Sequence, residues 1–453
     1  MLFHSAEFLV FLAAFLALLP LFKGEARIGY IGCASFVFYG WWYPPYLLLL
    51  LGLSTYAHVF GNRVALARRH LGWVVALGLL PLAVFKYTGF VFENLTLVTS
   101  AALPAAPDWA LPIGISFITF TAIAYVVDGV RGDPHRARNF WHTALFIAFF
   151  PQLIAGPILR ARELMDQVRD IRLDRTMLGA ALLLFSLGVV KKVGVADQIA
   201  PFVDGVFSDT ASLSAGRALL ALYGFSVQIY CDFSGYTDMA LALGLLLNVQ
   251  LPANFDSPYG ALSVRDFWRR WHMTLSRWLR DYLYIPLGGS RGGLVLTVCA
   301  LLATMLLGGL WHGAAWTFVI WGLVHGVLIA VEHVGRAAGP TLARVPKALR
   351  WFLVFHAVTF AWVFFRAPSL DDALAVFAAV GTGAGLADIA AAPFILGLIV
   401  AVLALHRWDR LTKIVGASEK LPLAVVATFS LMLILIGAAL SYNNPSAFIY
   451  FDF

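Results

Sequence analysis

The most constraining feature of this sequence is a succession of apolar stretches, many of them about 20 residues long, separated by short polar segments. A helix needs about that length to cross a bilayer, where its backbone groups must be hydrogen-bonded within the segment. The chain is 61% hydrophobic and only 13% charged, whereas a soluble domain carries about 25% charged residues. A soluble protein of this composition would lack polar side chains to cover its surface. The sequence therefore predicts an all-α, polytopic transmembrane helical bundle.

The apolar stretches define the predicted spans. They cover residues 6–22, 28–42, 44–60, 72–94, 111–128, 176–206, 216–247, 294–311, 315–332, 348–365, 391–406 and 421–441. Two further apolar pieces, 140–158 and 262–289, fit a simple crossing less well. We therefore expect about eleven to thirteen spans. They form a single integral membrane domain over residues 1–453.

Basic residues gather in some of the loops between these spans. The clusters are Arg63, Arg68 and Arg69; Arg131, Arg136 and Arg138; Arg160, Arg162, Arg169, Arg172 and Arg175; Lys347 and Arg350; and Arg407, Arg410 and Lys413. Loops 95–110 and 200–215 contain no Lys or Arg. Because cytoplasmic loops carry the excess of basic residues, we expect these clusters in the cytoplasm and both termini outside it. Short clusters of this kind do not form the long basic face of a nucleic-acid-binding protein.

The piece 140–158 has arginines near both ends, so a single crossing would place one basic cluster outside. Within it, Pro151, Gly156 and Pro157 fall inside eight residues and break a helix. A re-entrant hairpin that returns to the cytoplasm satisfies both facts. Irregular backbone at membrane depth is tolerated only where it is buried in protein or lines a cavity. The chain is therefore expected to enclose a cavity.

The piece 262–289 is too charged to span. Trp268, Trp271, Leu275 and Trp278 recur at helical spacing, which predicts an amphipathic helix in the cytoplasmic interface, with Ser263 as its N-cap. Its arginines have two possible roles, as ligands for a phosphorylated donor or as anchors to anionic lipid head groups. They are Arg265, Arg269, Arg270, Arg277 and Arg280.

Ionisable residues inside spans are costly and commonly functional. His312 lies between a glycine pair and Gly313, and glycines allow a backbone or a substrate to approach closely. A neutral imidazole in an apolar cavity can accept a proton from an alcohol, although a histidine that packs between helices is an equal alternative. His272 is either a surface imidazole or one that a dipping helix brings near His312. Asp238 could orient a histidine or pair within the bundle.

Lys191, Lys192, Asp232 and His325 are further ionisable residues that fall inside predicted spans. The chain has three cysteines, all in apolar segments and without a CxxC pair, so no metal site is expected.

Several blocks resemble the membrane-bound O-acyltransferase family, and most of all its bacterial alginate O-acetyltransferase branch. The blocks are 266–278 (DFWRRWHMTLSRW), 282–289 (YLYIPLGG), 310–313 (LWHG), 151–157 (PQLIAGP), 228–238 (QIYCDFSGYTD) and 448–453 (FIYFDF). The last block departs from the branch, where Gln is expected in place of Asp452. The two blocks that contain His272 and His312 are specific in combination, whereas the apolar spans carry almost no specificity.

The resemblance implies a helical bundle around a central tunnel in the inner membrane of a bacterium. It also implies a catalytic role for His312 and a second polar catalytic position at His272. Further candidates for substrate or donor binding are Arg269, Arg270, Arg277, Trp271, Trp311, Asp238 and His325. No bound cofactor is expected, and acetyl-CoA would serve as the donor substrate.

The predicted reaction is O-acetylation of an exported polysaccharide such as alginate. His312 would deprotonate an acceptor hydroxyl that attacks the thioester, and a separate periplasmic or extracellular transferase would take the acetyl group onward. Three alternatives remain open at this point. They are D-alanyl transfer to teichoic acid or acetyl transfer to peptidoglycan by the same fold, transport without covalent chemistry, and a structural scaffold.

Overall fold

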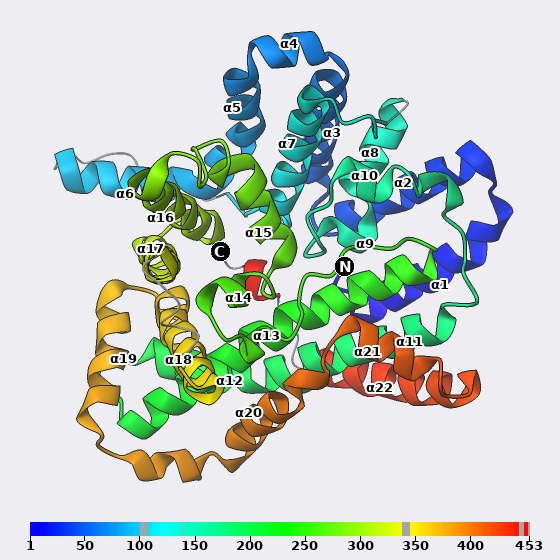
Figure 1. The fold of residues 1–453 in the computed structure, drawn as a ribbon. Helices are drawn as coiled ribbons and strands as arrows, with labels where there is room; N and C mark the ends of the chain where they lie inside the picture. Colours follow the sequence, from blue (N-terminus) through cyan, green and yellow to red (C-terminus); the bar gives the residue numbers. More distant parts are fainter. Residues whose placement is uncertain (100–106, 108, 138, 338–344, 444–447, 452–453) are drawn as a thin grey trace. The chain divides into compact units, whose positions relative to one another are not determined.

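The computed structural model describes residues 1–99, 107, 109–137, 139–337, 345–443 and 448–451, and within them it contains helices and no strand. Figure 1 shows this helical chain. The helices form two compact units, each built from segments that are distant in the sequence. The first unit comprises 1–189, 236–252 and 417–447, and the second comprises 190–235, 253–416 and 448–453. The predicted all-α membrane fold is confirmed.

Most helices of the first unit come from the N-terminal half of the chain. They are α1 Ala6–Leu18, α2 Gly24–Gly40, α3 Leu47–Asn62, α4 Val64–Arg69, α5 Leu71–Leu82, α6 Thr88–Thr99, α7 Ile115–Arg131, α8 Phe140–Ala148, α9 Phe150–Leu153, α10 Ala161–Leu164, α11 Leu178–Val189 and α22 Leu423–Asn443. The long helix α13, Ala215–Leu246, runs from the second unit into the first.

The second unit contains the two candidate histidines. Its helices are α12 Asp197–Ser208, α14 Val264–Trp268, α15 Met273–Leu279, α16 Gly293–His312, α17 Trp316–Ala337, α18 Lys347–Arg366, α19 Leu370–Thr382, α20 Pro393–Leu405 and most of α21 Leu411–Ser418. Short π-helical segments cover Ala83–Tyr87, Val190–Ala196 and Arg280–Tyr284. Short 3₁₀ segments cover Leu19–Leu21, Pro44–Tyr46, Val168–Asp170, Pro258–Gly260, Leu386–Ala391, His406–Trp408 and Ile449–Phe451.

Six continuous helical stretches among the described residues are long and apolar enough to cross a bilayer by themselves. They are Leu71–Thr99, Leu178–Ser208, Gly293–His312, Trp316–Arg336, Lys347–Arg366 and Leu423–Ser441. Two shorter apolar helices cover Ala6–Leu21 and Pro393–Trp408. The predicted count is higher because α2, α3 and α7, with 17, 16 and 17 residues, lie at the lower limit of a spanning length, and because the predicted span 216–247, which forms most of α13, is not among these six. The chain is a multi-pass membrane protein.

The segment 140–158 has the broken backbone that its prolines predicted. Helix α8 ends at Ala148, the chain turns at Phe149, and the four-residue helix α9 starts immediately before Pro151. The side-chain amide of Gln152 donates to the carbonyl of Phe146 at 2.9 Å across this break. Every residue from 142 to 159 is buried. Irregular backbone is therefore enclosed by protein, as a membrane environment requires.

The prediction of a single amphipathic helix over 262–289 is wrong. Helix α14 ends at Trp268, α15 begins at Met273, and His272 between them has a positive φ of 43°. The left-handed conformation is uncommon for a residue with a Cβ atom and terminates a helix. Ser263 caps α14 as predicted, because its hydroxyl accepts from the backbone N–H of Asp266 at 3.0 Å. The bend turns His272 into the core of the second unit.

Helices α16 and α17 lie side by side, and glycines allow their backbones to touch (Figure 1). A Cβ atom on Gly309 would lie 2.2 Å from the carbonyl oxygen of Phe318, and one on Gly322 would lie 2.2 Å from that of Met305. A Cβ on Gly313 would lie 2.0 Å from the Phe318 ring. The glycines around His312 therefore permit close approach of a neighbouring helix, which is one of the roles that the sequence suggested.

Candidate active site

His312 is the last residue of α16 and is 2% exposed. Four aromatic rings surround its imidazole, those of Trp311, Trp321, Phe365 and Tyr450, with centroid distances of 4.9, 5.0, 5.3 and 5.5 Å. We call these four residues the aromatic cage. They come from α16, α17, α18 and the 3₁₀ segment Ile449–Phe451, so four separate parts of the chain exclude water from one ring.

His272 lies beside this cage and is fully buried. Its ring centroid is 6.3 Å from that of His312, 6.0 Å from that of Trp311 and 4.7 Å from that of Phe233. The structure therefore brings the two predicted histidines together, and the alternative of a surface imidazole does not hold. Burial lowers the pKa of His272 from 6.5 to about 3, so this ring is neutral at physiological pH.

Asn254 determines which nitrogen of His272 carries the proton. The Asn254 Oδ1 accepts from the backbone N–H of Thr274 at 3.1 Å and lies 3.2 Å from His272 Nδ1. A backbone N–H can only donate, so the side-chain atom facing Thr274 is the oxygen and not the amide nitrogen. That oxygen can only accept, so Nδ1 of His272 carries the hydrogen. In a neutral ring the lone pair is then on Nε2.

His325 has the opposite tautomer. Its Nδ1 lies 3.3 Å from the indole Nε1 of Trp268, and an indole N–H can only donate. The proton of the neutral His325 ring is therefore on Nε2. His325 is fully buried, and its ring centroid lies 4.9 Å from that of Trp321 in the aromatic cage. Within the described part of the chain, His325 Nε2 and Trp321 Nε1 are buried without a hydrogen-bond acceptor.

A buried charge cluster holds the segment that carries Tyr450. Lys192 is 1% exposed, and its Nζ lies 2.7 Å from both Asp197 Oδ1 and Asp232 Oδ1. The second oxygen of Asp232 accepts from the backbone N–H of Ile449 at 2.9 Å. Asp232 is therefore a structural ion-pair partner, and its carboxylate fixes the backbone next to Tyr450. Sequence reasoning did not select Tyr450 as a site residue.

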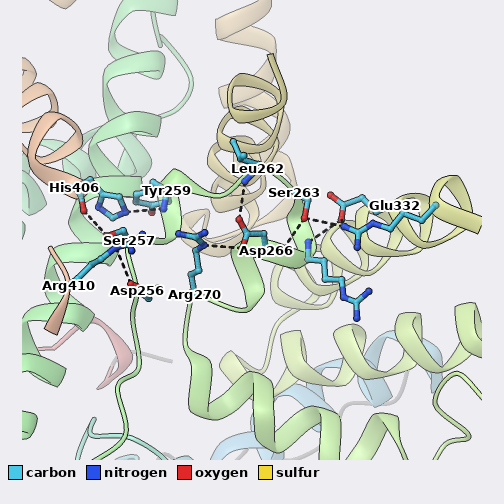
Figure 2. A network of polar contacts seen from close by, with 12 residues as sticks. Asp256, Ser257, Tyr259, Leu262, Ser263, Asp266, Arg270, Glu332, His406 and Arg410 are labelled. Atoms are coloured by element: carbon cyan, nitrogen blue, oxygen red, sulfur yellow. Dashed lines mark hydrogen bonds and ion pairs between the residues drawn. The ribbon is translucent and has the colours of Figure 1, made fainter. Parts of the chain in front are cut away.

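Figure 2 shows a second polar network, around the N-terminus of α14. Glu332 of α17 accepts from the backbone N–H groups of Val264 and Arg265, which have no partner inside the helix. Asp266 pairs with Arg270 at 3.0 Å. The Glu332 contacts fasten the start of α14 to α17. The bend at His272 is thus anchored from the α14 side.

The same figure shows the connection before α14. The side chain of His406 accepts from the backbone N–H of Tyr259 at 3.0 Å, and the hydroxyl of Ser257 donates to the carbonyl of His406 at 2.9 Å. Arg410 pairs with Asp256 at 3.2 Å. Asp256 in turn donates its backbone N–H to the carbonyl of Arg270, 3.0 Å away. The segment before α14 is therefore held to the end of α20 and to the bend.

The remaining predicted residues differ in their surroundings. Trp271 is fully buried, with its ring centroid 5.0 Å from that of Trp362, and Trp311 belongs to the aromatic cage. Arg269 is exposed and Arg277 is half-buried, whereas Arg270 is engaged by Asp266. Asp238 belongs to the first unit, whereas the other candidates belong to the second. Its role stays a prediction.

Comparison with known proteins identifies the family. A sequence profile of the membrane-bound O-acyltransferase family matches residues 134–369, a range that contains His272 and His312. The chain is 42% identical over 395 residues to the probable alginate O-acetylase of Azotobacter vinelandii, covering 84% of this chain and 78% of that protein. The chain belongs to the membrane-bound O-acyltransferase family. It is therefore an O-acyltransferase, and the alternatives of a transporter and a scaffold no longer apply.

Other members of this O-acyltransferase family differ in what their names say they act on. The chain is 41% identical to the peptidoglycan O-acetyltransferase of Helicobacter pylori, with 76% of this chain and 71% of that protein covered. It is 28% identical to the teichoic acid D-alanyltransferase of Bacillus subtilis, with 56% of this chain and 68% of that protein covered. Family membership thus establishes the class of reaction and not the acyl group or the acceptor.

Sequence reasoning missed Asn254 as well as Tyr450. Asn254 precedes His272 by 18 positions and sits in a short non-helical stretch after α13, where no helical or strand periodicity links it to the histidine. The only available signal for Tyr450 was the resemblance of block 448–453 to the family. Asp452, where that block departs from the expected Gln, lies outside the described residues.

Proposed function

We propose that this O-acyltransferase takes an acetyl group from acetyl-CoA on the cytoplasmic side and passes it through the membrane for O-acetylation of an exported polysaccharide. The observation that supports this most directly is the pair of buried imidazoles, 6.3 Å apart, beside the water-excluding aromatic cage. The identity to alginate and peptidoglycan O-acetylating relatives supports an acetyl group and a polymeric acceptor. We further propose that the two substrates meet at His312 through a central tunnel.

In the proposed reaction His312 is the general base. It takes the proton from the acceptor hydroxyl while the hydroxyl oxygen bonds to the thioester carbonyl carbon. The carbon–sulfur bond then breaks, and the thiol of the coenzyme leaves with the proton that His312 returns. His312 ends α16, so the negative end of that helix dipole favours the transient imidazolium. His272 orients the acceptor or stabilises the oxyanion, and the cage prevents hydrolysis of the thioester.

Replacement of His312 tests the assignment of the base. In purified protein, His312→Gln should lower acetyl transfer from acetyl-CoA by about 10²- to 10⁴-fold, the contribution typical of a general base. The change should leave the thermal unfolding midpoint close to that of the wild type. His70→Gln is the matched control, since His70 is exposed and lies in a basic loop. Unchanged acetyl transfer or acetyl-CoA hydrolysis in His312→Gln would refute the proposal.

The donor is tested by competition. Purified protein is given radiolabelled acetyl-CoA or a D-alanyl-loaded carrier protein, and label is followed into alginate oligosaccharide, peptidoglycan fragments or lipoteichoic acid. We expect transfer from acetyl-CoA only. Exclusive use of the D-alanyl carrier would instead support the function that the 28% identical teichoic acid relative carries.

Arg269, Arg270 and Arg277 are proposed to bind the donor phosphates, so their replacement should raise the donor KM more than it lowers kcat.

A periplasmic or extracellular transferase is proposed as the onward partner, in the envelope of a bacterium whose inner membrane holds this chain. The described connections between helices are short, and none of them forms a domain that could hold a polymer. Gene deletion of candidate transferases should abolish polysaccharide acetylation while the membrane protein still consumes acetyl-CoA. Acetylation that persists in every such deletion would contradict the proposal.

A further inference from the structure

The bend between α14 and α15 places a histidine, His272, in a backbone conformation that usually requires glycine. His272 has a left-handed backbone, which is strained for a residue with a Cβ atom. Such a conformation persists only where surrounding contacts determine it. Glycine adopts this conformation without strain, yet position 272 holds a large side chain that is fully buried. The contacts that keep His272 in this conformation therefore indicate the role of the bend.

Asn254 supplies most of those contacts. Its backbone carbonyl accepts from the N–H of Met273 at 3.0 Å, which fixes the residue directly after the bend. Its side-chain oxygen accepts from the N–H and the hydroxyl of Thr274, at 3.1 and 2.9 Å. The same oxygen faces Nδ1 of His272 at 3.2 Å. One residue, itself fully buried, thus holds both the strained backbone and the imidazole.

We propose that Asn254 is a positioning residue that holds His272 in a single tautomer, with the proton on Nδ1, so that Nε2 orients the acceptor sugar by accepting a hydrogen bond from a hydroxyl beside the one that reacts. This inference rests on the proposed function and narrows it. A neutral ring whose Nε2 carries no hydrogen cannot donate to an oxyanion through that nitrogen, so His272 orients the acceptor and takes no part in removing the proton of the reacting hydroxyl. The proton itself goes to His312, the other imidazole of the pair.

The chemistry around the ring supports this division. Among the described residues, Phe233, Trp311 and His312 have ring contacts with His272, and His312 is the titratable one of these three. Burial among such groups favours the neutral form of His272, which is the form that has a lone pair to offer. His325 is held in the opposite tautomer by Trp268. In the second unit, Nε2 of His272 is therefore a hydrogen-bond acceptor and Nε2 of His325 is a donor. Asn254 Oδ1, which can only accept, fixes the first ring, and the indole N–H of Trp268, which can only donate, fixes the second.

The experiment uses full-length protein in nanodiscs with ¹⁵N-labelled histidine. The signal of His272 is assigned as the one lost in His272→Asn. In the wild type it should show a protonated Nδ1 and an unprotonated Nε2. Asn254→Leu, which has similar volume and no acceptor, should shift that signal toward the other tautomer. The same variant should lower acetyl transfer from acetyl-CoA to alginate oligosaccharide by about 10- to 100-fold, with the KM for acetyl-CoA unchanged.

Two further variants make the test independent of folding. Asn254→Asp keeps an acceptor oxygen and adds a charge, so it should retain the tautomer and raise the pKa of His272. The acetyl transfer activity of Asn254→Asp should therefore be lost at pH values below this raised pKa and recover above it. Thr274→Val is the matched control, because it removes one hydroxyl bond to the same oxygen and leaves the backbone N–H. Its transfer rate should stay within about twofold of the wild type.

The outcomes separate this inference from the function on which it rests. A protonated Nε2 in the wild type, or a spectrum and rate unaltered by Asn254→Leu, would overturn the role of Asn254. Activity that survives in His312→Gln, together with the expected His272 spectrum, would instead overturn the proposed base and leave the tautomer assignment standing. An Asn254→Asp variant with a wild-type pH profile would also refute the inference, since the added carboxylate must then not act on His272.

Discussion

At the scale of single residues, the tautomers of the buried histidines are set by neighbours that have only one hydrogen-bonding role. A backbone N–H fixes the amide of Asn254, which in turn fixes His272, and an indole fixes His325. The sequence could select His325 because ionisable residues are rare in apolar spans, whereas the catalytic assignment of His272 rested on the family resemblance. It could not select Asn254, because the 18 positions between Asn254 and His272 correspond to no local repeat. The tautomers were therefore beyond sequence reasoning.

The depressed pKa of His272 gives a prediction about stability and pH. The folded value is about 3 and the unfolded value is 6.5, so between these pH values the unfolded chain binds a proton that the folded chain excludes. Because of His272, the free energy of unfolding is at its full value above pH 6.5 and decreases as the pH falls toward 3, by about 1.4 kcal/mol per pH unit. We therefore expect the wild type to lose thermal stability relative to His272→Asn as the pH is lowered from 7 to 4.

Asparagine is the variant of choice for that comparison, because it tolerates the left-handed backbone of position 272 and does not titrate. Thermal unfolding midpoints of both proteins are measured in the same detergent at each pH. A difference in midpoint that stays constant across the range would mean that His272 is solvated and not buried in the folded protein.

At the scale of helices, the approach of α16 to α17 depends on glycines that face each other. Gly322→Ala should therefore force the two helices apart, since its Cβ would lie 2.2 Å from a backbone carbonyl that cannot rotate away. We expect a loss of about 1–3 kcal/mol in the free energy of unfolding, as for other overpacked sites. Acetyl transfer should fall as well, because α16 ends in His312.

Gly335 provides a control within the same helix. A Cβ at that position meets nothing within 4 Å, so Gly335→Ala should be neutral or stabilise the protein by about 0.5–1 kcal/mol through helix propensity. Thermal unfolding and acetyl transfer are measured for both variants. Equal behaviour of Gly322→Ala and Gly335→Ala would show that the α16–α17 contact does not limit stability.

Helices were predicted well where local chemistry decides and poorly where distant contacts decide. Prolines and a glycine broke 140–158 at Phe149, and Ser263 capped α14, as the local sequence indicated. The bend at His272 was missed because the periodicity of the tryptophans continues through it. What interrupts that periodicity is the set of hydrogen bonds from Asn254 to Met273 and Thr274. Tertiary contacts overrode a local helical pattern.

At the scale of the whole molecule, each compact unit is assembled from parts that are far apart in the sequence. Lys192, Asp232 and Ile449 meet in the second unit, and this contact brings Tyr450 to His312. Buried charges were predictable from the sequence, because Lys192 and Asp232 are costly residues in apolar spans. Their pairing follows from the fold, which is why the composition predicted a membrane bundle but not the partners of its charges.

The orientation of the bundle yields the last prediction. If basic loops face the cytoplasm, His70 lies inside and Ser208, from the loop without Lys or Arg, lies outside. Both side chains are exposed and flank helical stretches that can span a bilayer. Single cysteines are introduced at these positions after Cys33 and Cys299, the exposed native thiols, are replaced by serine. A membrane-impermeant maleimide should label Ser208→Cys in intact spheroplasts and His70→Cys only after permeabilisation. The reverse pattern would place the basic loops outside, and acetyl-CoA would then have to reach His312 from the opposite side of the bundle.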